Sequence, residues 1–187
     1  MAADGAAPLS LPESVILEST NVCNIKCKMC FQSLAEYQAP RGFMSRELFV
    51  KCLDEIKRAG GFHCIQLSLF GEPLLHPEIV DFVRIGWQEY GLSVYFSSNA
   101  LLLDPGMSEQ LVKAGLRALS ISLDAASAEV YERIRRGSAH GQVMENLRTF
   151  IAVRNRLNQG RPRNLPTLSV KFAMQAENMA ERQDFRK

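Results

Sequence analysis

The chain has 187 residues, of which 47% are hydrophobic and 22% are charged, and its formal net charge is +2. This is enough chain to bury one core without disulfide bonds, and the near balance of charge gives no reason to expect a nucleic-acid or membrane surface. No run approaches the roughly 18 apolar residues of a membrane span and no secretory signal is present, so the five cysteines favour a reducing compartment, the cytoplasm, with free or metal-bound thiols.

Residues 1–13 are rich in Ala, Gly, Pro and Ser without periodicity, so a flexible arm is expected before one domain over 14–187. Apolar runs and alternation predict five strands, at 14–19, 65–71, 92–97, 119–124 and 167–173. Apolar residues at helical spacing predict intervening helices within 45–60, 77–91, 111–115, 130–134 and 143–151, and a further helix from Asn178. The stretch 158–166 is predicted to be a loop from its Gly, Pro and Asn content.

Strands that alternate with helices in this way predict right-handed βαβ units and a parallel sheet. The fourth predicted strand has one apolar face, and its other face carries Ser120, Ser122 and Asp124. In a sheet that curls toward a barrel, that polar face would line a cavity at the carboxyl ends of the strands. The alternative is that the polar row simply faces solvent.

Cys23, Cys27 and Cys30 lie within the string CNIKCKMC, directly after the first predicted strand. Three thiolates from one loop would leave one iron of a [4Fe–4S] cube free for another ligand, because iron–sulfur clusters are normally held by four cysteines. Two other interpretations are a zinc site with Cys52, Cys64 or His63 as fourth ligand, and a simple electron-transfer iron–sulfur protein. Cys52 and Cys64 themselves occupy apolar patterns, which are typical of core positions.

Further short motifs stand at or beyond the ends of the predicted strands: FGEP at 70–73, SSNA at 97–100, SISLDA at 120–125, YERIRRG at 131–137 and NMAE at 178–181. Together with the cysteine motif, this ordered set resembles the radical S-adenosylmethionine (radical SAM) enzymes, especially the branch with a C-terminal SPASM or twitch extension. The resemblance implies an α/β fold, a partial (β/α)6 barrel of the TIM-barrel-like type. Five strands are predicted, so the sixth strand and any C-terminal module are expected to be missing.

The resemblance implies two cofactors, a [4Fe–4S] cluster and S-adenosylmethionine, with an external reductant such as flavodoxin or ferredoxin. It also implies reductive cleavage of S-adenosylmethionine to a 5′-deoxyadenosyl radical that abstracts hydrogen from a substrate. Peptides, proteins and small molecules are all substrates in this branch, and no catalytic residue can be assigned from the sequence. The alternative is a non-catalytic fragment that binds an iron–sulfur cluster or a metal.

Roles follow from the resemblance only where residues match its motifs. The three motif cysteines would ligate the cluster, and the turn of Gly71, Glu72 and Pro73 would meet the methionine ammonium. Ser122 would hydrogen-bond S-adenosylmethionine, while Arg135, or its neighbour Arg136, would pair with the carboxylate of that cofactor. The remaining candidates for ribose, methionyl or adenine contacts are Ser98, Asn99, Asp124, Asn178 and the aromatic Phe31.

Overall fold

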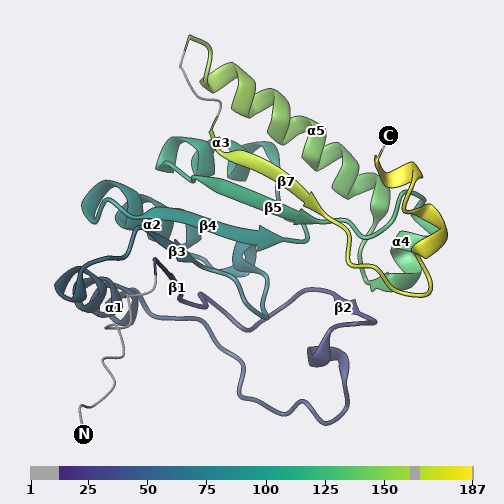
Figure 1. Ribbon diagram of the computed structural model, residues 1–187, viewed down its shortest axis with the longest axis horizontal. Coiled ribbons are helices and arrows are strands. Elements are labelled where there is room, and N and C mark those ends of the chain that lie inside the picture. Colours follow the sequence, from purple (N-terminus) through teal and green to yellow (C-terminus); the bar gives the residue numbers. More distant parts are fainter. Residues whose placement is uncertain (1–12, 161–164, 187) are drawn as a thin grey trace, which may run out of the picture.

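The computed structural model describes residues 13–160 and 165–186, so the predicted arm, apart from Glu13, and part of the predicted 158–166 loop lie outside the described residues. Five parallel strands form one sheet in the order β1-β3-β4-β5-β7, and helices connect them (Figure 1). The strands are β1 (Ser14–Ile16), β3 (Cys64–Gln66), β4 (Ser93–Ser98), β5 (Ala118–Ser122) and β7 (Thr167–Lys171). The predicted α/β class and the partial barrel are therefore confirmed.

The first two strands are shorter than predicted, although backbone contacts continue beyond their ends, where the Leu17 and Ser19 amides donate to the Gln66 and Leu67 carbonyls at 2.8 and 3.1 Å. Beyond β1, the Glu18 carboxylate accepts hydrogen bonds from the backbone N–H groups of Phe70 and Gly71. Those two amides, which follow β3, therefore bond to a side chain rather than to a neighbouring strand. The predicted run 65–71 accordingly ends as a strand at Gln66 and continues as a turn.

Every helix predicted between the strands is present: α1 (Arg46–Ala59), α2 (Ile79–Arg84) continued by a π-helical turn (Ile85–Glu89), α3 (Pro105–Ala114), α4 (Ala128–Ile134) and α5 (His140–Leu157). Ser45 caps α1 by accepting a hydrogen bond from the Leu48 amide at 3.1 Å. The helix predicted from Asn178 is replaced by two short 3-10 turns, Met179–Glu181 and Asp184–Arg186. No helix among residues 13–160 and 165–186 is long and apolar enough to span a bilayer.

The two faces of the sheet differ in chemistry, because side chains alternate along each strand. One face packs under the helices and supplies the fully buried side chains Ile65, Leu67, Val94, Phe96, Leu119 and Ile121. Helix residues such as Phe49, Phe82 and Phe150 complete this core. The opposite face is polar and carries Gln66, Tyr95, Ser97, Ser120, Ser122, Ser169 and Lys171.

A second, two-stranded sheet was not predicted. β2 (Lys26–Cys27) pairs antiparallel with β6 (Arg135–Arg136), so that Cys27 lies opposite Arg135. The Lys28 amide extends this contact by donating to the Ile134 carbonyl at 2.8 Å. The YERIRRG motif is thus joined through its backbone to the cysteine segment.

Candidate functional site

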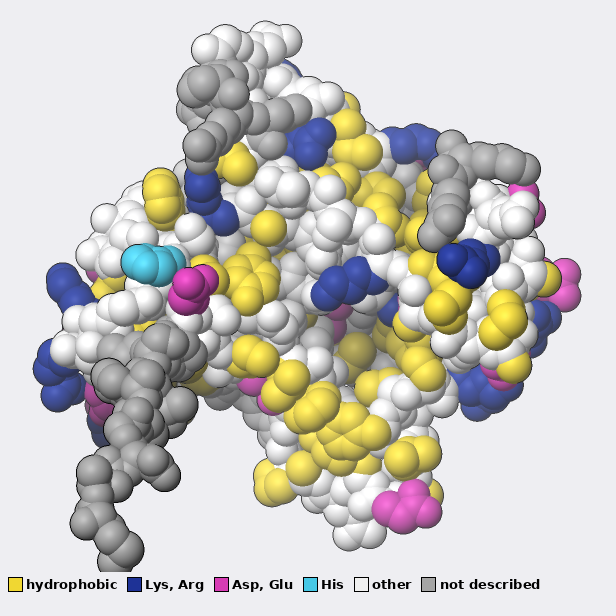
Figure 2. All heavy atoms as spheres, viewed as in Figure 1, with side chains coloured by type: hydrophobic (Ala, Val, Ile, Leu, Met, Phe, Trp, Pro, Cys, Tyr) yellow, Lys and Arg dark blue, Asp and Glu magenta, His cyan; other side chains and the backbone are white. Residues whose placement is uncertain are grey.

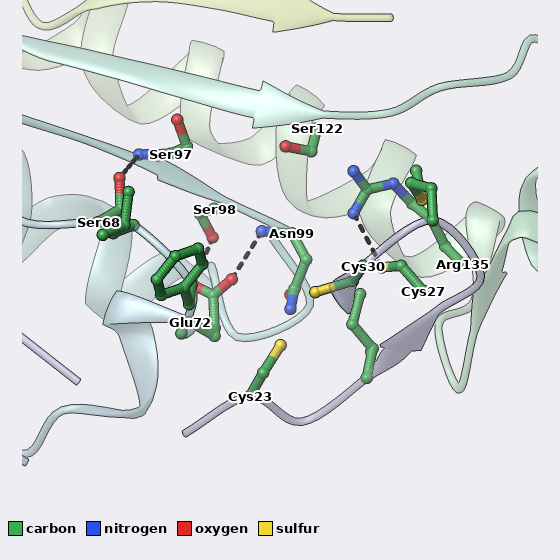
Figure 3. Close-up of a pocket in the computed structure, with 15 residues that line it drawn as sticks. Cys23, Cys27, Cys30, Ser68, Glu72, Ser97, Ser98, Asn99, Ser122 and Arg135 are labelled. Carbon is green, nitrogen blue, oxygen red and sulfur yellow. Dashed lines mark hydrogen bonds between the residues drawn. The ribbon is translucent and has the colours of Figure 1, made fainter. Parts of the chain in front are cut away.

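A cavity of about 250 Å³ lies at the carboxyl ends of the strands, next to the cysteine segment (Figure 3). Its walls come from several strand ends and loops, as the repeated βαβ connection requires. Nine of the predicted site residues line it: Cys23, Cys27, Cys30, Gly71, Glu72, Ser98, Asn99, Ser122 and, from β6, Arg135. Because Ser122 lines the cavity, the polar face of β5 does reach a possible ligand, whereas Ser120 contacts Ser169.

The three motif cysteines are half-buried and face this cavity (Figure 3). Burial raises the pKa of the Cys23 thiol and raises that of Cys27 to about 11, although the charge of Arg135 opposes the second shift. Thiols must lose their protons to ligate a metal, and the charge of a bound metal supplies the stabilisation that the protein alone does not. Three thiols that line one cavity are a donor set that fits an iron–sulfur cluster.

The predicted zinc alternative does not fit the described structure. Cys64 begins β3 and lies opposite Ser14, at the amino-terminal end of the sheet, and His63 directly precedes it. Cys52 belongs to α1 and is half-buried away from the cavity. Within the described ranges, no three His, Cys, Asp or Glu side chains are arranged to hold a single metal ion.

The turn after β3 fits tightly against the chain that leads into the cysteine segment. A Cβ atom at Gly71 would lie 2.0 Å from the Thr20 carbonyl oxygen and 2.8 Å from that of Val22. The next amide, that of Glu72, donates to the Val22 carbonyl at 2.8 Å. Gly71 is therefore needed for close approach of two backbones, one of which continues into Cys23.

We expect Gly71→Ala to lower the free energy of unfolding by about 1–3 kcal/mol or more, because the clashing atoms belong to backbone and cannot rotate away. Urea unfolding under reducing conditions measures this change. Gly141→Ala in α5 is the matched control, since a Cβ there meets nothing within 4 Å. A Gly71→Ala protein as stable as the Gly141→Ala protein would contradict the close-approach argument.

Glu72 is only 3% exposed, and its carboxylate joins the turn to the end of β4. It accepts hydrogen bonds from the Ser98 hydroxyl at 2.7 Å, the Asn99 amide at 2.7 Å and the Leu74 amide at 3.1 Å. Burial raises the pKa of Glu72, while these three donors act in the opposite direction. The predicted contact with a methionine ammonium would place a positive charge against this carboxylate.

The raised pKa of Glu72 has a consequence for stability. The folded protein keeps the proton at pH values where the unfolded chain has lost it, so the contribution of Glu72 to stability falls as the pH rises through the raised pKa. Gln does not titrate. We therefore expect the free energy of unfolding of wild type, minus that of Glu72→Gln, to decrease as the pH rises above about 4, where a Glu side chain of the unfolded chain loses its proton. A difference that stays constant or increases over this range would contradict the raised pKa.

Arg135 and Asp124 form a buried ion pair beside the cysteine segment. The Arg135 Nε and Nη2 atoms donate to one Asp124 oxygen at 2.9 and 2.6 Å, and both side chains are less than 10% exposed. The remaining nitrogen, Nη1, donates to Cys27 Sγ at 3.7 Å. Arg135 thus lines the cavity with its charge already balanced by Asp124, whereas Arg136 is exposed.

Four predicted residues lie outside the cavity lining. Pro73 begins a buried 3-10 turn, and Asp124 adopts the left-handed conformation (φ 60°) and also accepts from the Ala173 amide at 2.6 Å. Asn178 is fully buried and donates to the carbonyl groups of Asp124 and Ala173, so it closes the turn after β7. Phe31 packs edge-on against Tyr37 and Phe70, where Figure 2 shows hydrophobic side chains gathered in the region of the loop after β2.

Sequence reasoning missed Ser68 and Ser97, which also line the cavity. The Ser97 amide donates to the Ser68 hydroxyl at 2.8 Å, and the Lys171 ammonium donates to the Ser97 hydroxyl at the same distance. Alternation along the second and third predicted strands places both serines on the polar face. That signal was available, but the sequence alone does not show that the two strands are neighbours.

A parallel sheet with thiols, hydroxyl groups and a balanced arginine around one cavity at its carboxyl edge defines an α/β protein that binds cofactors. A family model described as the radical SAM superfamily matches residues 17–157, and the chain belongs to this family. The family binds a [4Fe–4S] cluster and S-adenosylmethionine, and these are the two cofactors predicted from the sequence.

Curated relatives include a GTP 3′,8-cyclase of Microcystis aeruginosa, which is 35% identical over 115 residues. The match covers 60% of this chain and 34% of that relative. An AdoMet-dependent heme synthase of Methanosarcina barkeri is 31% identical over 129 residues, which are 69% of this chain and 36% of the relative. The chain therefore spans about a third of the length of these relatives.

Solved structures share the fold at low sequence identity. Native anSMEcpe with bound AdoMet superposes with a TM-score of 0.67 at 17% identity, covering 85% of this chain and 43% of that one. Streptococcus suis SuiB superposes with a TM-score of 0.69 at 15% identity, and the match covers 95% of this chain and 36% of SuiB. These likenesses agree with the partial barrel described above.

Proposed function

We propose that this chain is the cofactor-binding core of a radical SAM enzyme that cleaves S-adenosylmethionine reductively. The observation that carries the proposal is that the three motif cysteines, the turn after β3 and the hydroxyl of Ser122 surround one cavity in a chain of this family. When bound, the cluster supplies the electron for cleavage, and the resulting 5′-deoxyadenosyl radical abstracts hydrogen from a substrate.

The protein residues position and shield the cofactors in this proposal. Cys23, Cys27 and Cys30 hold the cluster. The Gly71–Glu72–Pro73 turn receives the methionine ammonium, with the Glu72 carboxylate fixed by Ser98 and Asn99. Ser122 and Arg135 line the cavity and offer donors for the polar groups of S-adenosylmethionine.

Three finer predictions extend this proposal. The SLDA and YERIRRG motifs favour the branch that carries SPASM or twitch extensions. The predicted enzyme class is an oxidoreductase that acts through hydrogen abstraction. A flavodoxin or ferredoxin is the predicted reductant. The five cysteines favour the cytoplasm, where thiols remain reduced.

The test is anaerobic reconstitution of the chain with iron and sulfide, followed by dithionite and S-adenosylmethionine. Chromatography of the products should show 5′-deoxyadenosine and methionine in equal amounts. A chain that binds the cluster and S-adenosylmethionine but forms no 5′-deoxyadenosine would overturn the proposal in favour of the non-catalytic fragment.

A further inference from the structure

Lys171 is the only charged residue in the described strands of the main sheet, β1, β3, β4, β5 and β7. It ends β7 and pairs in register with Ser122 of β5, which lines the cofactor cavity. The backbone carbonyl of Lys171 accepts from the Leu123 and Asp124 amides at 3.1 and 3.3 Å. The base of this side chain is therefore held firmly beside the cavity.

The Lys171 side chain lies along the polar face of the sheet. Its ammonium donates to the Ser97 hydroxyl on β4, although β5 separates β4 from β7 in the strand order. An exposed lysine without a role usually extends into water, where its head group is fully hydrated. Here the ammonium instead reaches across β5 to a residue that lines the cavity.

The ammonium has no carboxylate partner among the described residues. Two carboxylates near the site are already hydrogen-bonded: that of Glu72 accepts three hydrogen bonds from the turn and the end of β4, and that of Asp124 accepts from Arg135 and Ala173. Hydroxyl groups lie near Lys171 on the polar face: Ser97, which it contacts, Ser122, its register partner on β5, and Ser169, two residues earlier on β7 and bonded to Ser120. An ammonium that donates to one hydroxyl group, with further hydroxyl groups on the same face, offers the kind of donors that bind an anion.

We propose that Lys171, with the serine hydroxyls beside it, binds a carboxylate or phosphate group of the substrate. This inference rests on the proposed function, which places the cofactors in the cavity. The polar face beside the cavity is then left for the substrate. The anionic group would be held on β7 and β5, so that the rest of the substrate extends toward the cavity rim at Ser97 and Ser122. The substrate class is therefore a molecule with at least one carboxylate or phosphate.

The test measures anion binding to the anaerobically reconstituted chain with S-adenosylmethionine in excess, so that the cluster offers no open iron. Inorganic phosphate and succinate are the two probes, titrated separately by calorimetry against wild type, Lys171→Met and Lys171→Arg. Lys113→Met is the matched control, because Lys113 is an exposed lysine of α3 paired with Glu109. No reduction or turnover is needed.

We expect Lys171→Met to weaken binding of the preferred anion by about tenfold or more, Lys171→Arg to retain most of it, and Lys113→Met to match wild type. Stronger binding of phosphate or of succinate identifies the anionic group. Equal binding by wild type and Lys171→Met, or binding of neither probe, overturns the inference. Because the assay requires no cleavage, a wild-type chain that forms 5′-deoxyadenosine but binds neither anion would contradict this inference alone.

Discussion

Cys27→Ala is expected to abolish retention of the iron–sulfur cluster. Cys27 supplies one of three thiols around the cavity, and its backbone pairs with Arg135. With one iron left for S-adenosylmethionine, a cluster held by two thiolates would have two irons without protein ligands. Iron and sulfide content, together with visible absorption after anaerobic reconstitution, measures the loss. Cys23→Ala and Cys30→Ala should behave in the same way.

Cys64→Ala provides the matched control, because it removes the same atoms at the opposite end of the sheet. Its thiol lies near the Glu13 carbonyl and far along β3 from the cavity. We expect wild-type iron content and a loss of stability of at most about 1 kcal/mol, at the low end for a partly buried substitution. Loss of iron in Cys64→Ala, or in Cys52→Ala, would show that the ligand assignment is wrong.

The main sheet was predictable because hydrophobic alternation and glycine stops act over short distances. The apolar faces of the strands predicted at 92–97 and 119–124 placed their ends within one or two residues of those of β4 and β5. The errors came where the chain remains apolar but changes partners. Leu69 and Phe70 follow the alternating pattern, yet the Phe70 amide bonds to Glu18, a residue 52 positions away.

The contacts of the site depend on pairing that no local pattern encodes. A strand of two residues is too short to show alternation, so β2 and β6 gave no sequence signal. The residues that they pair are far apart in the chain: Cys27 and Arg135 are separated by 108 positions. The motifs predicted which residues gather at the cavity. They did not predict that Asp124 is the ion-pair partner of Arg135, or that Asn178 closes the turn after β7.

Asp124→Asn is expected to lower the free energy of unfolding by about 3–5 kcal/mol, because it leaves the buried Arg135 guanidinium without a counter-charge. Asn is the informative replacement, since it tolerates the left-handed backbone at this position and keeps an oxygen for the Ala173 amide. Urea unfolding of the cluster-free chain under reducing conditions measures the change. Glu129→Gln is the matched control: its pair with Arg133 is exposed, so a change below about 1 kcal/mol is expected.

The double variant Asp124→Asn, Arg135→Met separates the cost of an unpaired charge from the loss of packing. Met removes the charge and fills part of the space of the arginine stem, so the double variant should be more stable than Asp124→Asn alone. If the double variant is no more stable than the single variant, the unpaired charge is not the cause. In that case the loss would reflect the turn that Asp124 forms with Ala173 and Asn178, which ties the end of β7 to the end of β5.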